Sequence, residues 1–117
     1  MKDDVLVKKA YAFAVSVVKA YQCLCTDKKE FVLSKQLLRS GTSIGANIAE
    51  ANGAISKADF SAKMSVAYKE CLETKYWLSL LQDTGYMEEK IYTELFAAAD
   101  ELGKILFSIL KTTGMNQ

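Results

Sequence analysis

The sequence predicts an all-α protein, a single antiparallel four-helix bundle with up-down-up-down order. Proline, which interrupts helices, is absent from all 117 residues. Four segments repeat apolar residues at three- and four-residue spacing, and short polar stretches separate them. No segment alternates like a strand or reads as a linker or internal repeat. The length suits one domain, and four helices of matched length with short links favour antiparallel neighbours.

The first helix is expected over residues 4–25, with acidic residues at its start, where the helix dipole favours them. One apolar stripe runs along it: Leu6, Ala10, Phe13, Val17, Tyr21 and Leu24. A second stripe lies beside the first: Val7, Tyr11, Ala14, Val18 and Cys25. Such a wide apolar surface either packs entirely into the core, or packs one stripe into the core and the other against a partner. The sequence leaves both possibilities open.

The second helix is expected over residues 30–52 and combines bulky apolar residues with a row of small ones. The row repeats every four residues along one face: Gly41, Gly45, Ala49 and Gly53. Missing side chains let helices approach closely, so this face predicts close helix packing. Two interior glycines cost about 1 kcal/mol each relative to alanine. A break near residues 40–42 is therefore the alternative to one continuous helix.

The third and fourth helices are expected over residues 57–83 and 88–112. Ser56 is placed to cap the third helix, with Asp59 at the position of a capping-box carboxylate. The apolar stripe of the third helix comprises Phe60, Met64, Ala67, Cys71, Leu78 and Leu81. The stripe of the fourth comprises Ile91, Leu95, Ala98, Leu102, Ile105 and Ile109, with a second stripe widening it.

Several kinds of chemistry are not expected here. Without any histidine, the chain has neither the usual nucleophilic triads nor the Glu-x-x-His pairs of di-iron bundles. Its three cysteines do not suit a disulfide framework, and Cys23 and Cys25 point to nearly opposite sides of a helix. No phosphate-binding glycine motif is present. We expect no enzymatic activity, cofactor or metal, and inward-facing Glu50, Glu70, Glu73 and Glu101 would lack imidazole co-ligands.

Charge is unevenly distributed along the chain. Residues 1–69 hold 11 basic and 6 acidic residues, whereas residues 70–117 hold 4 and 8. This asymmetry favours one basic and one acidic surface, or head-to-tail association. The candidate nucleic-acid contacts are Lys8, Lys9, Lys19, Lys28, Lys29, Lys35 and Arg39, joined by Lys57 and Lys63 on the third helix. Solvated lysines are the plainer interpretation. The N-terminal segment resembles neither a signal peptide nor a membrane span, so we expect a cytoplasmic protein.

A polar stripe follows one side of the second helix. Its members follow one another at steps of four or three residues, and all but the last are neutral: Gln36, Ser40, Ser43, Asn47 and Glu50. Arg39, the only arginine, projects beside it. The stripe is either a solvated face or a hydrogen-bonded network at a seam between helices or subunits. In the second case Arg39, Ser43, Asn47 and Glu50 are the functional candidates.

These residues carry a resemblance to a known family. The stretch FVLSKQLLRSGTSIGANIAEA, residues 31–51, resembles the signature of the bacterial four helix bundle proteins, also called 23S rRNA intervening-sequence proteins. Downstream, KxxF at 57–60, KExxETxYWL at 69–78 and LL at 80–81 fit the same pattern. The resemblance extends over nearly the whole chain, from about residue 11 to residue 111.

The resemblance implies an up-and-down bundle that assembles into a ring-shaped homopentamer. Some members are encoded inside intervening sequences of 23S rRNA genes. A related branch, the accessory proteins of diversity-generating retroelements, forms basic pentamers that work with a reverse transcriptase. RNA binding is the family's usual presumption, and no enzymatic activity is assigned to it.

The leading hypothesis is therefore a non-enzymatic homo-oligomer, a pentamer by resemblance, with an RNA-binding or rRNA-associated role and no membrane partner. One alternative is a protein-interaction scaffold that uses exposed apolar faces without nucleic acid. Another is a helix-turn-helix DNA binder built on residues 43–50. That fold requires the second helix to break, so one continuous helix through Gly41 would exclude it.

Overall fold

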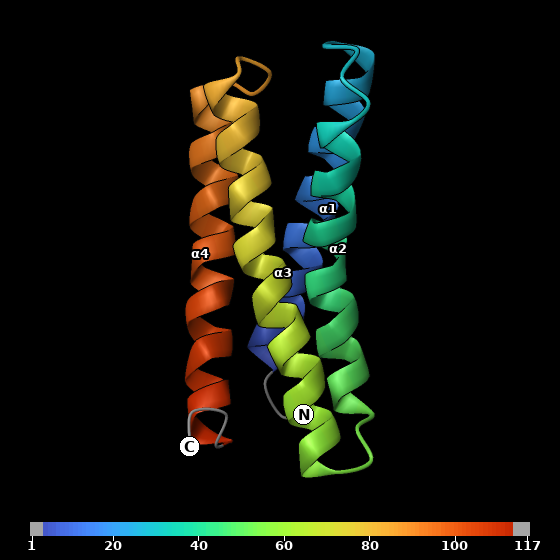
Figure 1. The fold of residues 1–117 in the computed structure, drawn as a ribbon, viewed down its shortest axis with the longest axis vertical. Coiled ribbons are helices and arrows are strands. Elements are labelled where there is room, and N and C mark those ends of the chain that lie inside the picture. The colour runs from blue at the N-terminus through green and yellow to red at the C-terminus, as the bar shows by residue number, and fades with distance from the viewer. Residues whose placement is uncertain (1–3, 114–117) are drawn as a thin grey trace.

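The computed structural model describes residues 4–113, which fold into four α-helices without a strand. The helices are α1 (Asp4–Thr26), α2 (Leu33–Asn52), α3 (Lys57–Asp83) and α4 (Glu89–Thr112). They run alternately up and down along an elongated body of 44 × 23 × 22 Å (Figure 1). The all-α prediction is confirmed.

The helices pack in a closed cycle. α1 contacts α2, α2 contacts α3, α3 contacts α4, and α4 contacts α1, whereas α1 and α3 lie diagonally opposite, as do α2 and α4. The contact between α1 and α4 is the least extensive of the four. The bundle is therefore looser on the side between its first and last helices.

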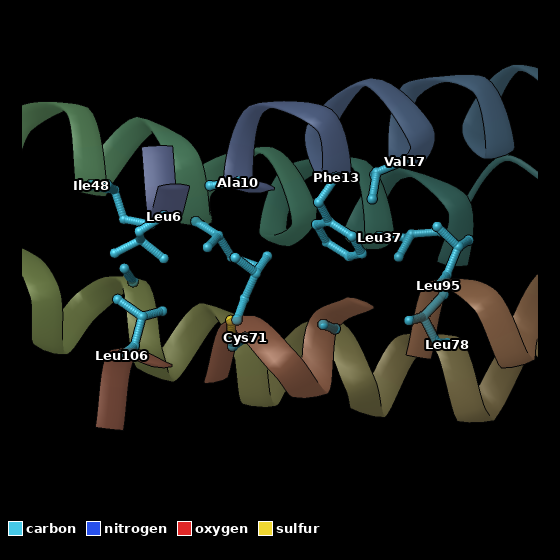
Figure 2. Close-up of a cluster of buried hydrophobic side chains, with 14 of the residues drawn as sticks. Leu6, Ala10, Phe13, Val17, Leu37, Ile48, Cys71, Leu78, Leu95 and Leu106 are labelled. Carbon is cyan, nitrogen blue, oxygen red and sulfur yellow. The ribbon is translucent and has the colours of Figure 1, made fainter. Parts of the chain in front are cut away.

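All four helices contribute to one apolar core. α1 places Leu6, Ala10, Phe13 and Val17 against side chains of the other helices, as Figure 2 shows. α3 contributes Met64, Ala67, Cys71, Leu78 and Leu81, and α4 contributes Leu95, Ala99, Leu102, Leu106 and Leu110. On α1 and α3 the buried positions follow the predicted stripes. On α4 the predicted stripe is only partly right, because Ile91 is 40% exposed and three core positions, Ala99, Leu106 and Leu110, come from the second stripe beside it. In the part of the chain that the structure describes, no helix has the length and apolarity needed to cross a membrane.

The predicted helix ends lie within one residue of the observed ones, except at the start of α2. That helix begins at Leu33 rather than Glu30. The Glu30 carboxylate accepts hydrogen bonds from the backbone N–H groups of Val32, Leu33 and Ser34, at 3.1, 3.0 and 2.7 Å. Glu30 thus satisfies the free donors at the first turn instead of belonging to it. The predicted cap of α3 is present, since Asp59 N donates to Ser56 Oγ at 3.0 Å.

α2 is a single helix through Gly41, so the alternative of a break at residues 40–42 is wrong. The helix-turn-helix hypothesis is excluded with it. A Cβ atom at Gly41 would lie 2.8 Å from both methyl carbons of Val17, and one at Gly45 would lie 3.5 Å from the carbonyl oxygen of Ala10. The missing side chains therefore let α2 approach α1. For the other two members of the predicted row the close-packing prediction is wrong, because Ala49 is exposed and Gly53 is exposed and follows the last residue of α2.

Candidate functional site

The polar stripe of α2 lies at the seam between α2 and α3. Ser40 and Thr74 are fully buried there, and their hydroxyl oxygens are 2.9 Å apart. Thr74 Oγ1 also lies 2.7 Å from the carbonyl oxygen of Glu70. Ser40 therefore lies at a seam between two helices and not on a solvated face. Its contact with Thr74 gives each of the two buried hydroxyls a hydrogen-bond partner.

Arg39 joins this seam from its outer edge. Its guanidinium forms an ion pair with Glu73 and a second one, at 3.3 Å, with Glu70. Arg39 Nε donates to Gln36 Oε1 at 3.2 Å, and Trp77 Nε1 donates to Glu73 Oε2 at 2.9 Å. The two negative charges of these carboxylates therefore exceed the single positive charge of Arg39.

Glu50, the charged residue at the end of the stripe, also has an ion-pair partner within the chain. Lys63 Nζ lies 2.9 Å from Glu50 Oε1, and the hydrogen bond and charge of Glu50 raise the pKa of Lys63. Asn47 Nδ2 donates to Ser43 O at 2.8 Å and lies 3.0 Å from Ser43 Oγ, so these two side chains stay on α2. Each of the four candidate stripe residues thus has a hydrogen-bond or ion-pair partner within its own chain.

The candidate lysines are not gathered in one place. Lys19, Lys28, Lys29 and Lys35 lie towards the end of the bundle where α1 leads into α2, at the upper right of Figure 1. Lys8 and Lys9 lie near the start of α1, more than 20 Å from that end at about 1.5 Å per residue. Lys9 is paired with Glu101 at 3.1 Å. Lys8 and the four lysines at the α1–α2 end are exposed, and among the described residues they have no carboxylate within 4.0 Å.

A groove of about 630 Å³ follows the loose side of the bundle between α1 and α4. Small side chains from both helices line it, including Ala12, Ser16, Ala20, Cys23 and Ala98. Lys9, Lys19 and Lys28, with Asp27, border it on the α1 side, and Glu88, Glu94 and Glu101 border it on the α4 side. The sequence analysis missed this groove. The sequence feature that could have indicated the groove is a row of small residues on α1, spaced by four or three residues.

The three cysteines are free thiols in different environments. Burial raises the pKa of the Cys71 thiol to about 12, so this thiol stays protonated and unreactive at neutral pH. Cys23 is exposed and Cys25 half-buried, and both are free. Within residues 4–113 no group of three histidine, cysteine or acidic side chains is placed to hold a metal ion.

Comparisons with known proteins assign the chain to a family. Residues 2–108 match the sequence profile of the 23S rRNA-intervening sequence protein family. A crystal structure of a protein of unknown function, from the S23 ribosomal protein family of Bacteroides thetaiotaomicron, is 49% identical to the chain. The likeness covers 91% of this chain and 98% of that one, with a TM-score of 0.89. Among curated proteins, no match was found. The chain therefore belongs to the 23S rRNA-intervening sequence protein family.

Proposed function

We propose that this protein is a non-enzymatic helical bundle that assembles with copies of itself into a ring and binds RNA in that form. Membership of the family supports the RNA-associated role, and the resemblance described above supports a pentamer. The observation that carries the RNA proposal is the set of four lysines at the α1–α2 end, which have no ion-pair partner among the described residues. Repetition around a ring would place several copies of this basic end along one strand.

Self-association is supported by apolar side chains on the outside of the bundle. Tyr11 on α1 is 72% exposed, and Tyr76 on α3 is 61% exposed. Val5, Val15 and Val18 on α1, and Val66 and Leu72 on α3, are also exposed, whereas no large apolar side chain of α2 is. On α4, Ile91 and Phe107 are each 40% exposed. A bundle that leaves apolar side chains uncovered on three helices gains free energy by covering them with another copy.

The RNA role predicts a steep dependence of affinity on salt. Each phosphate contact made by a lysine releases counterions, so the plot of log affinity against log salt has a slope of about −0.7 per contact for single-stranded RNA. The double variant Lys29→Gln/Lys35→Gln should bind more weakly and show a shallower slope, by about 1.4 for two lost contacts. Fluorescence anisotropy with a labelled single-stranded RNA over a salt series measures both quantities.

The matched control is Lys69→Gln/Lys111→Gln, which removes two exposed lysines from the middle of α3 and the far end of α4. It should keep the wild-type slope. Equal losses in both variants would mean that net charge alone drives binding, and no binding by the wild-type protein at low salt would remove the RNA proposal.

A protein-interaction scaffold is the second candidate, and the groove between α1 and α4 favours it. Its apolar lining and charged borders suit an amphipathic helix. Comparison of pull-downs with and without RNase separates the candidates: the scaffold requires one defined partner that survives RNase and is lost when the groove is blocked.

A further inference from the structure

We infer that Phe31, in the connection between α1 and α2, stacks against an unpaired base of single-stranded RNA, while the lysines around it contact the flanking phosphates. The inference rests on the RNA binding proposed above and adds the part of the ligand that charge alone does not recognise. It follows from the exposure of Phe31, from the contacts that fix its connection, and from the lysines on either side.

Phe31 is an aromatic side chain that the bundle leaves uncovered. It is 52% exposed, which makes it the most exposed of the five phenylalanines. It belongs neither to the buried core nor to the partly buried side chains packed against that core. A single exposed apolar side chain is common on protein surfaces, so the case for a ligand depends on how this one is held and on what surrounds it.

The backbone of the connection is fixed by hydrogen bonds to α1. Asp27 N donates to the carbonyl oxygen of Cys23 at 2.8 Å, and Glu30 N donates to that of Leu24 at 3.0 Å. Between them Lys29 has a φ of 56°, in the left-handed region that residues other than glycine seldom adopt. Such a conformation persists only where surrounding contacts impose it, and it is found preferentially at binding sites.

Glu30 explains why the ring of Phe31 faces solvent. The buried Glu30 carboxylate accepts three backbone hydrogen bonds from the first turn of α2, and the Glu30 carbonyl oxygen accepts one from Ser34 Oγ at 2.7 Å. Because residue 30 is drawn inward, the two residues between it and α2 remain at the surface, where Val32 is 71% exposed. The ring is therefore presented in a fixed position, which lowers the entropy lost when a ligand binds.

Three lysines lie close to this ring along the chain. Lys28 and Lys29 precede Phe31 by three and two residues, and Lys35 follows it by four. At about 3.6 Å per residue at most, their Cα atoms lie within about 14 Å of the Cα atom of Phe31. All three are exposed and, in the described part of the chain, have no ion-pair partner. Phosphates on both sides of a stacked base are therefore within reach of free positive charge.

Negative charge opposes these lysines only weakly. The acidic residues between positions 26 and 35 are Asp27 and Glu30, and the Glu30 carboxylate is occupied by backbone donors. Those same donors form the N-terminus of α2, so they are not free to bind a phosphate. Phosphate contacts at this end consequently fall to the lysine side chains, and base contacts to Phe31.

An aromatic ring among free lysines suits a single strand better than other anionic partners. Proteins bind single-stranded nucleic acid by stacking bases on aromatic side chains and by placing basic groups along the backbone. A duplex does not offer its base faces in this way. An anionic membrane attracts the same residue types, but its affinity grows with the apolar area inserted, and here only Phe31 and Val32 could insert.

The test compares a labelled single-stranded RNA with an abasic oligomer of the same length, which keeps the phosphates and lacks the bases. In fluorescence anisotropy the wild-type protein should bind the RNA more tightly by a factor of about 5 to 150, the value of one base–aromatic stack. Phe31→Ala should bind both oligomers equally. Its salt slope should match that of the wild type, because no phosphate contact is lost.

Three variants serve as controls. Phe31→Tyr keeps an aromatic ring and should keep the preference for RNA over the abasic oligomer. Val32→Ala removes the more exposed apolar neighbour and should also keep it, because stacking requires the ring alone. Phe31→Leu keeps apolar volume without a ring, so it should lose the preference even if Phe31→Ala folds poorly. Urea denaturation and light scattering should show a stable fold and an unchanged mass for the variants compared.

The outcomes separate this inference from the proposed function. No RNA binding by the wild-type protein at low salt removes both. RNA binding that Lys29→Gln/Lys35→Gln weakens and both Phe31→Ala and Phe31→Leu leave unchanged overturns the inference alone. Equal losses in Phe31→Ala and Val32→Ala, or a loss accompanied by a lower mass, would overturn it in favour of a contact between proteins. Binding to phosphatidylserine vesicles that requires Phe31, with RNA binding unaffected by its loss, would overturn it in favour of a membrane.

Discussion

Gly41→Ala is expected to destabilise the protein by about 1–2 kcal/mol, although alanine is the better helix former. The new Cβ atom would lie 2.8 Å from Val17 Cγ1 and from Val17 Cγ2. Val17 is fully buried, and its β-branched side chain has little rotational freedom to move away. Overpacking of this kind costs about 1–3 kcal/mol, and two close contacts favour the upper part of that range. The gain of about 1 kcal/mol from helix propensity offsets only part of it.

Gly45→Ala is the matched control for this prediction. Its Cβ atom would lie 3.5 Å from the carbonyl oxygen of Ala10, an ordinary contact distance, so the variant should be more stable by up to about 1 kcal/mol. Urea denaturation followed by circular dichroism gives both free energies of unfolding. The double variant Gly41→Ala/Val17→Ala should lose less stability than the two single variants together, because the smaller residue 17 removes the overlap. Stabilisation of the same size at both glycines would contradict close packing at Gly41.

The sequence predicted those features of the fold that depend on local patterns. Leu6, Ala10, Phe13 and Val17 were assigned to one stripe from their spacing, and all four are buried. The start of α2 was placed too early because Glu30 suits a helix by propensity. Its role as a cap depends on how its side chain folds back onto the next turn, which periodicity does not reveal.

The candidate site was less predictable because its contacts join distant parts of the chain. Small polar residues along α2 suggested a seam, but its partners Thr74, Glu70 and Glu73 lie on another helix, more than thirty residues away. Arg39 was a candidate for RNA because an isolated arginine is a good phosphate ligand. Once α3 is placed beside it, two carboxylates occupy that arginine. Helix order and spacing therefore decide which charges remain free, and the sequence alone does not specify them.

The groove between α1 and α4 also could not be predicted from the sequence alone. Ala12, Ser16 and Ala20 could have marked a tight contact, as Gly41 does on α2. Instead they line the side where α1 and α4 contact each other least. A row of small residues permits close approach but does not require it, because the larger side chains elsewhere on both helices set their separation.

Glu30→Ala is expected to destabilise the protein by about 2 kcal/mol at neutral pH. The carboxylate accepts three backbone hydrogen bonds at the first turn of α2, and its residue is only 8% exposed. Loss of a helix cap costs about 0.5–2 kcal/mol, and hydrogen bonds to a charged acceptor lie at the upper end. Asp27→Ala, an exposed acidic position in the same connection, is the control and should change the free energy of unfolding by less than about 0.5 kcal/mol.

The contribution of Glu30 should also depend on pH. Burial by itself raises the pKa of this carboxyl, but the hydrogen bonds from Leu33, Ser34 and Val32 outweigh it and hold the pKa below its ordinary value of 4.5. A carboxyl with a lowered folded-state pKa stabilises the fold fully above its unfolded-state pKa, and this stabilisation is lost as the pH falls through the folded-state pKa. The difference in unfolding free energy between wild type and Glu30→Gln should therefore be constant near neutrality and shrink as the pH falls below about 4.5. A difference that stays unchanged down to pH 3 would mean that the charge of Glu30 does not contribute to the cap, and that the side chain acts only through its shape.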